Sequence, residues 1–192
     1  MSPLTPSPPP LHRYSPPSPN TITNNTRYHK HPLRKLPLIM STTTQPPPWH
    51  AAYPAPKTTP ASMTRAEVLA LMDSAAASAG KNYILVDLRR NDHEGGTIRG
   101  SVNLPAQSLY PALPTVYTMF KAAGIKKVLW YCGSSSGRGT RAAGWFADYL
   151  AERGDLEMRS LVLDGGIKGW VKGGSEFVAR MDEYDAAVWA AL

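Results

Sequence analysis

The chain of 192 residues has little cysteine, no long apolar run and an uneven supply of acidic residues. Cys132 is the only cysteine, which excludes an intrachain disulfide and a cysteine-rich zinc site. No apolar run approaches the roughly 20 residues that a membrane-spanning helix needs, and no secretory signal core is present. We therefore expect a reducing location, the cytoplasm or the nucleus, and no membrane partner.

Acidic residues are absent from the first 62 positions, and this absence explains the basic composition. The formal net charge is +7, yet residues 1–62 hold six of the 21 basic residues and none of the 14 acidic ones. Residues 63–192 therefore carry a net charge of only +1. Because the net charge of residues 63–192 is close to zero, the charge does not indicate a nucleic-acid partner.

Proline is concentrated in the same segment, which holds 16 of the 19 prolines. Because proline lacks an amide donor and few large apolar residues accompany it, residues 1–62 are predicted to form a disordered, Pro-rich tail. The runs at 8–10 and 46–48 favour polyproline II, which SH3 and WW domains bind. Mitochondrial targeting is an alternative, although the prolines oppose the amphipathic helix of a transit peptide. Met40 offers an alternative translation start.

Residues 63–192 show strand and helix patterns in alternation. Thr64 and Glu67 form the signature of a capping box for a first helix, which we expect to end at Gly80. Alternation of this kind predicts an α/β domain with a mostly parallel sheet covered by helices on both faces. Strands are expected at 83–86, 101–104, 128–131 and 161–163, and further helices around 114–120 and over 138–153 and 176–192.

The strand at 128–131 leads into Cys132 and a loop of small residues, after which Arg138 opens a helix. The order strand, loop, helix directs backbone N–H groups and the positive end of the helix at the loop, where they would bind an anion. The same field favours the nucleophilic thiolate form of cysteine. Arg138 adds a planar pair of donors for a tetrahedral oxyanion. The loop residues are Gly133, Ser134, Ser135, Ser136 and Gly137.

A lone cysteine at the end of a strand is otherwise most often a small buried residue of the core. Five consecutive glycine and serine residues after Cys132 are unsuited to a core, but they allow a ligand to approach the backbone closely. This composition favours the interpretation of Cys132 as a nucleophile.

Four segments in this order resemble the rhodanese domain family, over about residues 64–170. They are Val86-Asp87-Leu88-Arg89, the run GGTIRGSVNL at 95–104, the cysteine loop and the run DGGIKGW at 164–170. The resemblance implies a rhodanese-like fold over the catalytic domain at 63–192. It also implies that the domain has neither a metal nor a bound organic cofactor.

The length of the cysteine loop divides this family by chemistry. Its sulfurtransferases typically place four residues after the cysteine, whereas its cell-division-cycle dual-specificity phosphatases and eukaryotic arsenate reductases use Cys-x5-Arg. The spacing from Cys132 to Arg138 matches the second branch. The resemblance therefore implies a tyrosine or dual-specificity phosphatase, or an arsenate reductase, acting on a phosphorylated substrate or on arsenate. A thiosulfate sulfurtransferase is one alternative, and a non-catalytic binding module is another.

The chain departs from the phosphatases of this branch at two positions. Tyr131 stands where they often have histidine, and Gly137 stands where they have an acidic residue. Asp87 and Asp164 are the remaining candidate acids, with a structural role as the alternative for each. Arg141 either strengthens the anion field or pairs with a surface acid. An arsenate reductase with a single cysteine would need glutathione or glutaredoxin as external reductant.

Overall fold

The computed structural model describes residues 46–191. The disorder predicted for residues 1–45, the proline run at 8–10, the targeting alternative and the start at Met40 lie outside the described residues. Pro46, Pro47 and Pro48 are exposed and belong to no helix or strand. Over residues 46–191, no helix is both long and apolar enough to cross a membrane.

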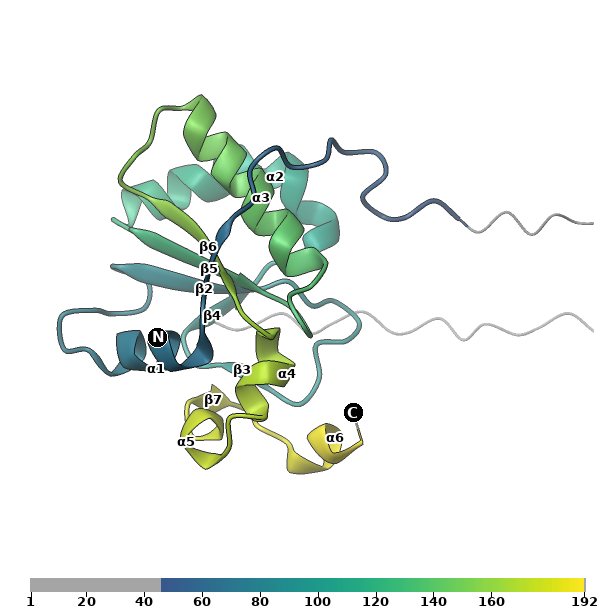
Figure 1. Ribbon diagram of the computed structural model, residues 1–192, viewed down its shortest axis with the longest axis vertical. Helices are drawn as coiled ribbons and strands as arrows, with labels where there is room; N and C mark the ends of the chain where they lie inside the picture. The colour runs from purple at the N-terminus through teal and green to yellow at the C-terminus, as the bar shows by residue number, and fades with distance from the viewer. Residues whose placement is uncertain (1–45, 192) are drawn as a thin grey trace, which may run out of the picture. The chain divides into compact units, whose positions relative to one another are not determined.

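A sheet of five parallel strands in the order β1-β6-β5-β2-β4 forms the centre of the domain (Figure 1). Its middle strand is β5, in which Leu129 pairs with Leu161 on one side and with Leu85 on the other. Cys132 therefore follows the most central strand, at the edge where the carboxyl ends of all the strands meet. The parallel sheet confirms the predicted fold class. The strands are β1 (Ala61–Met63), β2 (Tyr83–Asp87), β4 (Ser101–Asn103), β5 (Lys127–Tyr131) and β6 (Arg159–Leu163).

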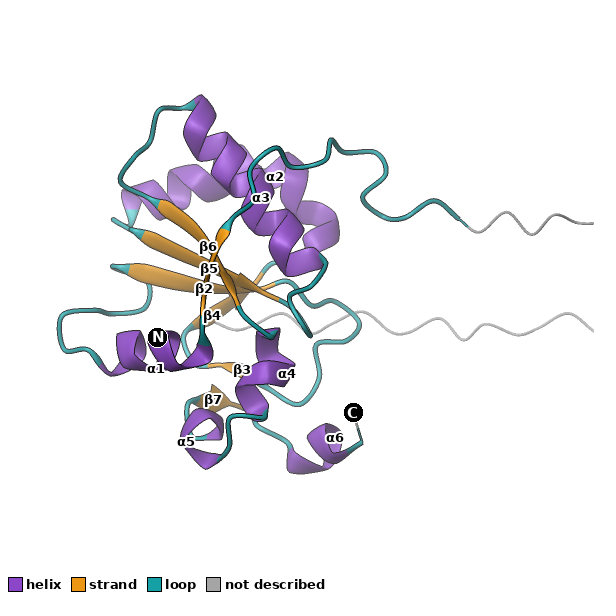
Figure 2. Cartoon of the chain, viewed as in Figure 1, coloured by secondary structure: helices purple, strands orange, loops and turns teal. Residues whose placement is uncertain are grey.

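Helices cover both faces of this sheet, as predicted (Figure 2). One face carries α2 (Ala106–Ala122) and α3 (Arg138–Glu152). The other face carries α1 (Arg65–Asp73) and α4 (Gly166–Val171), with α5 (Ser175–Val178) beside them. A two-stranded antiparallel ribbon of β3 (Thr97–Ile98) and β7 (Met181–Asp182) and the short helix α6 (Ala186–Ala190) complete the described chain.

Alternation along β5 divides its side chains between two buried cores. Val128 and Trp130 pack in the core under α2 and α3, and Cys132 continues this set. Leu129 and Tyr131 pack in the core under α1 and α4. Successive side chains of a strand point to opposite faces, so the chain reaches Cys132 with its side chain on the α3 side.

Three predicted helices differ from the observed ones. The predicted capping box is confirmed, since Thr64 and Glu67 exchange hydrogen bonds at the start of α1. However, α1 ends at Asp73, because Ser74 has an extended backbone. Gly80 serves the turn into β2 instead, with φ +79°.

The helix predicted around 114–120 extends over 17 residues as α2, with Pro111 and Pro114 inside it. Each proline removes one backbone donor, yet the helix buries an apolar face at intervals of three or four residues. Burial of this face against the sheet compensates for the missing hydrogen bonds. The buried face consists of Leu109, Leu113, Val116 and Phe120.

The single helix predicted over 176–192 is wrong. The chain forms α5, β7 and α6 in its place. Met181 pairs with Ile98 in the two-stranded ribbon, and Glu183 adopts a left-handed φ of 55°, so a continuous helix cannot form.

The predicted tail also ends earlier than residue 62, because residues 49–62 pack on the domain. Residues 49–60, here called the N-terminal strap, run along α3 and lead into β1 (Figure 1). Trp145 Nε1 donates to the carbonyl of Pro54 at 2.7 Å, and the ring of Tyr53 stacks on Tyr110 at 4.9 Å. Proline removes donors from the strap, but its carbonyls and aromatic rings still bind α2 and α3.

Candidate active site

The loop after Cys132 turns sharply because Ser135 adopts a left-handed backbone with φ 59°. Ser135 is 4% exposed, and its hydroxyl accepts the N–H of Cys132 at 3.4 Å. Its carbonyl accepts the hydroxyl of Thr140 at 2.7 Å, which ties the loop to the first turn of α3. The loop is therefore held in one shape from both ends.

The amide N–H groups of the loop are free to bind an anion. Within residues 46–191, none of the N–H groups from Gly133 to Arg138 donates a hydrogen bond to the protein. Gly137 precedes α3 and supplies no side-chain cap to it. Six consecutive free donors at the N-terminus of a 15-residue helix form a nest for a negatively charged group.

The start of α4 supports the opposite side of the loop. The N–H of Ile167 donates to the carbonyl of Cys132 at 3.0 Å, and the N–H of Lys168 donates to that of Gly133 at 2.9 Å. Gly166 allows this approach, because a Cβ there would lie 2.7 Å from the Gly133 carbonyl and 2.9 Å from the Ser135 nitrogen. The loop carbonyls are thus bound to α4, which leaves the amide groups for a ligand.

Cys132 lies at a cavity of about 320 Å³ formed by the loop, the start of α3 and the N-terminal strap. Its thiol is not bonded to another cysteine, and the residue is only 3% exposed. The cavity combines this thiol with two guanidinium groups and no carboxylate. It is lined by Trp49, His50, Cys132, Ser134, Ser136, Gly137, Arg138 and Arg141.

Asp92 holds Arg138 by two hydrogen bonds. Arg138 Nη1 donates to Asp92 Oδ1 at 2.8 Å, and Nη2 donates to Oδ2 at 2.5 Å. The Asp92 carboxylate raises the pKa of Arg138, and the nearby Cys132 adds to this effect. In return, the Arg138 guanidinium holds the pKa of Asp92 well below its usual range. Arg138 thus lies between a carboxylate that orients it and the thiol.

Comparison with known proteins identifies the family of the domain. Residues 64–173 match the family model of the rhodanese-like domain. The chain belongs to this family. None of the curated protein sequences matches it.

Solved structures support the same fold for this rhodanese-like domain. A structure of the arsenic–antimony reductase from Leishmania major is 23% identical, with a TM-score of 0.51, over 56% of this chain and 73% of the reductase. A yeast protein tyrosine phosphatase of the rhodanese family is 21% identical, with a TM-score of 0.51, over 69% of this chain and 98% of the phosphatase. A second structure of the same Saccharomyces cerevisiae protein, described as a homologue of single-domain rhodanese and the Cdc25 phosphatase catalytic domain, is 20% identical, with a TM-score of 0.51, over 68% of this chain and 92% of the yeast chain. At these identities the similarity establishes the fold.

Asp87 is a structural residue of the rhodanese-like domain. It is fully buried, and its carboxylate accepts hydrogen bonds from Arg89 Nη2 at 2.7 Å and from the hydroxyl of Thr97 at 3.1 Å. It does not line the Cys132 cavity. The structure therefore favours the alternative in which an acid at a strand end fixes a neighbouring arginine.

Asp164 is exposed and accepts the hydroxyl of Ser62 at 3.2 Å. It lines a neighbouring depression with Ser134 and Ser136, but not the cavity of Cys132. Neither candidate acid is thus brought to the thiol.

Arg141 lies at the Cys132 cavity of the rhodanese-like domain, and its guanidinium is 5.8 Å from the Trp145 ring centre. No carboxylate pairs with Arg141 in the part of the chain that the structure describes. The interpretation that it strengthens the anion field is therefore favoured over pairing with a surface acid.

Tyr131, which replaces a histidine in this branch of the family, points away from the cavity. Its hydroxyl is within 2.7 Å of the Thr97 hydroxyl and donates to that of Ser101 at 2.8 Å. Burial, together with the charge of Asp87, raises the pKa of Tyr131, so the phenol stays protonated. Tyr131 therefore connects β5 to β3 and β4 and does not line the cavity.

Three residues of the site were missed by sequence reasoning. Asp92 lies 46 positions before Arg138 in an exposed loop, and no pattern connects the two. Trp49 and His50 were assigned to the tail because of the surrounding prolines. The aromatic residues among those prolines were the one signal that this segment packs on the domain.

Proposed function

We propose that this chain is a cysteine-dependent phosphatase, of the tyrosine or dual-specificity type, that hydrolyses phosphate monoesters. The observation that supports it best is the set of six free N–H groups from Gly133 to Arg138 around the thiol of Cys132. With two arginines and no carboxylate at the cavity, this arrangement suits a doubly charged tetrahedral anion.

In the first step, the Cys132 thiolate attacks phosphorus. A sulfur–phosphorus bond forms, the ester oxygen–phosphorus bond breaks, and the leaving oxygen takes the bonding electron pair. The loop N–H groups and Arg138 stabilise the charge on the three non-bridging oxygens. In the second step, water attacks phosphorus, the sulfur–phosphorus bond breaks, and inorganic phosphate and the thiolate are released.

The loop length supports phosphate over sulfane sulfur. Five residues separate Cys132 from Arg138, and the free N–H groups from Gly133 to Arg138 are enough donors for the three non-bridging oxygens of a phosphate group. A sulfurtransferase would need to stabilise only one terminal sulfur on the cysteine. A non-catalytic binding module would require neither the buried thiol nor the oriented guanidinium.

Arsenate reduction is the second candidate, because the same nest fits arsenate and a fold neighbour is an arsenic–antimony reductase. Cys132 would displace hydroxide from arsenate and form a sulfur–arsenic bond. The thiolate of an external thiol such as glutathione would then attack the Cys132 sulfur. The sulfur–arsenic bond breaks with its electron pair going to arsenic, so that arsenite is released and a mixed disulfide remains on Cys132; each of the two sulfurs has given up one electron. Glutaredoxin would reduce this disulfide, since the chain has no second cysteine.

The test compares a phosphate ester with thiosulfate and cyanide on one preparation of the full chain. Purified protein should release p-nitrophenol from p-nitrophenyl phosphate, and Cys132→Ser should abolish this activity. Arg138→Lys keeps the positive charge but loses the planar pair of N–H donors, so it should reduce kcat strongly while the protein stays folded. Equal rates for the wild type and Cys132→Ser would refute the proposal. Faster formation of thiocyanate from thiosulfate and cyanide would assign the protein to the sulfurtransferases.

A further inference from the structure

The proposed phosphatase reaction needs a proton donor that the cysteine loop lacks. The leaving oxygen must be protonated unless it belongs to an acidic alcohol, such as a phenol with an electron-withdrawing group. Gly137 has no side chain to donate, and Asp87 and Asp164 do not line the cavity. Asp92 stays ionised and paired with Arg138. For esters of less acidic alcohols, a donor must therefore come from another part of the cavity wall.

His50 of the N-terminal strap is in that wall. It lines the same cavity as Cys132 and Arg138 and is half-buried. Apart from the nucleophile itself, it is the one cavity-lining side chain that serves as a general acid and base in enzymes, since an imidazole can both donate and accept a proton whereas a guanidinium only donates.

Aromatic contacts fix the position of His50 relative to α3. The ring of Trp49 meets the imidazole edge-on at 5.3 Å and meets the Trp145 ring edge-on at 6.0 Å. Trp145 belongs to the helix that begins at Arg138, so His50 is positioned against the same helix that carries the anion site.

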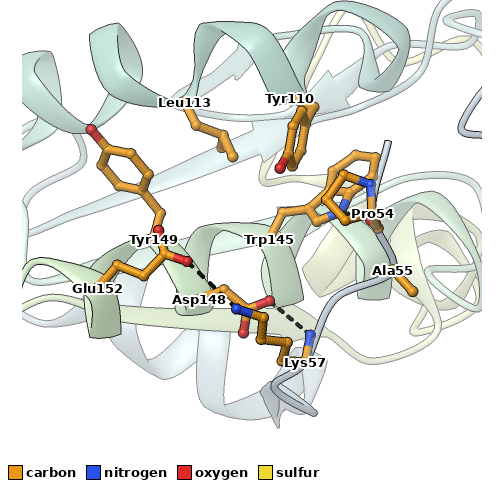
Figure 3. Close-up of a pocket in the computed structure, with 9 residues that line it drawn as sticks. All are labelled: Pro54, Ala55, Lys57, Tyr110, Leu113, Trp145, Asp148, Tyr149 and Glu152. Atoms are coloured by element: carbon orange, nitrogen blue, oxygen red, sulfur yellow. Dashed lines mark hydrogen bonds and ion pairs between the residues drawn. The ribbon is translucent and has the colours of Figure 1, made fainter. Parts of the chain in front are cut away.

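Further along the strap, the Asp148 carboxylate accepts the backbone N–H groups of Lys57 at 2.7 Å and Thr58 at 2.9 Å. Figure 3 shows the contact between Lys57 and Asp148, and it shows Pro54 beside Tyr110 of α2 and Trp145 of α3. The strap is therefore bound over most of its length, which a catalytic side chain requires.

We propose that His50 is the general acid and base of this phosphatase, an inference that rests on the proposed function. In the first step, the imidazolium of His50 gives its proton to the leaving ester oxygen as the oxygen–phosphorus bond breaks. In the second step, the neutral imidazole takes a proton from the attacking water, which restores the imidazolium as phosphate is released. The acid thus comes from the segment before the domain's first strand and replaces the one missing at Gly137. The substrate class widens to esters of weakly acidic alcohols, including phenyl and alkyl phosphates.

The test measures the dependence of kcat on the leaving group in the full chain. His50→Gln should lower kcat for phenyl phosphate by about 100-fold, because phenolate leaves poorly without a proton. For p-nitrophenyl phosphate, whose leaving group needs no proton, the same substitution should change kcat by less than about threefold. His93→Gln is the matched control. Its imidazole contacts Asp87 at 3.5 Å outside the cavity, so the ratio of the two rates should stay at the wild-type value.

The outcomes separate the two proposals. If the wild type hydrolyses both esters through Cys132, but His50→Gln leaves their ratio unchanged, the role of His50 is refuted and the phosphatase stands. If neither ester is hydrolysed in a Cys132-dependent way, both proposals fail. The thermal midpoint of His50→Gln should match the wild type, and an equal loss on both esters would assign His50 to the structure of the strap.

Discussion

Asp92 and Arg138 are 46 positions apart, and their side chains meet through two hydrogen bonds beside the thiol of Cys132. The pair connects the loop after β2 to the first turn of α3. It orients the guanidinium, but it also places a carboxylate close to a site for anions. Asp92 therefore has two opposing effects on a bound phosphate.

The first prediction separates these effects. Asp92→Ala should lower kcat for p-nitrophenyl phosphate by about tenfold, because Arg138 loses the partner that orients it. The same change should lower the inhibition constant of inorganic phosphate several-fold, because a negative charge near the anion is removed. Steady-state kinetics with phosphate as competitive inhibitor measures both quantities.

Asp92→Asn is the control for this prediction, since it removes the charge and retains an acceptor for Arg138. It should bind phosphate as tightly as Asp92→Ala and lose less of kcat. A value of kcat in Asp92→Ala equal to that of the wild type would show that Asp92 does not orient Arg138.

The second prediction concerns Gly166, at the junction of α4 and the cysteine loop. Gly166→Ala should destabilise the domain by about 2 kcal/mol or more and abolish phosphatase activity. Its φ of +57° is unfavourable for alanine, and the new Cβ would press on the carbonyls of Cys132 and Gly133. Urea unfolding and phosphatase rates measure the two effects.

Gly154→Ala is the matched control, because Gly154 has a similar φ of +64° and no atom within 4 Å of the added Cβ. It should cost about 1 kcal/mol from backbone strain alone and leave phosphatase activity intact. Equal effects of the two substitutions would mean that the contact with the loop is unimportant.

The third prediction follows from the single cysteine. Any reduction of arsenate should require added glutathione and glutaredoxin, and should stop when either is omitted, because no internal thiol can resolve the adduct on Cys132. Arsenite formation is measured in the presence and absence of each reductant. Multiple turnover without external thiol would contradict this argument.

The fourth prediction concerns stability and Asp155, whose side chain is 2% exposed at the end of α3. A hydrogen bond from Lys121, with others from the N–H groups of Met158 and Glu157, holds the pKa of Asp155 well below its usual range despite burial. The stabilisation by this carboxylate is present above its unfolded pKa of about 3.9 and is lost as the pH falls towards the folded value.

Asp155→Asn should therefore reduce the free energy of unfolding by about 1–2 kcal/mol at pH 7, with part of the Lys121 contribution screened by solvent. The difference from the wild type should shrink below about pH 4. Asp182→Asn is the control: Asp182 is half-exposed beside Arg99, and its loss should cost less than about 0.5 kcal/mol. A pH-independent difference for Asp155→Asn would contradict the assignment. Urea unfolding of both proteins at several pH values measures this difference in the free energy of unfolding.

Much of the fold could be predicted because its signals are local. The capping box of Thr64 and Glu67, the strand that ends before Cys132 and the buried aromatic residues of α3 each depend on residues a few positions apart. The predictions of secondary structure were wrong where pairing between distant strands overrides the local spacing of apolar residues. Residues 176–192 have helical spacing, but the pairing of Met181 with Ile98 places a strand there.

The sequence by itself determined the proposed nucleophile and the proposed anion-binding loop, because Cys132, the small loop residues and Arg138 are contiguous and their order alone directs the backbone amides. The tertiary structure decided which other groups surround them. Asp92 reaches Arg138 from a loop after β2, and His50 reaches the cavity because aromatic residues of the strap pack on α3. Such contacts depend on how strands and helices stack in three dimensions, and no spacing along the chain encodes them.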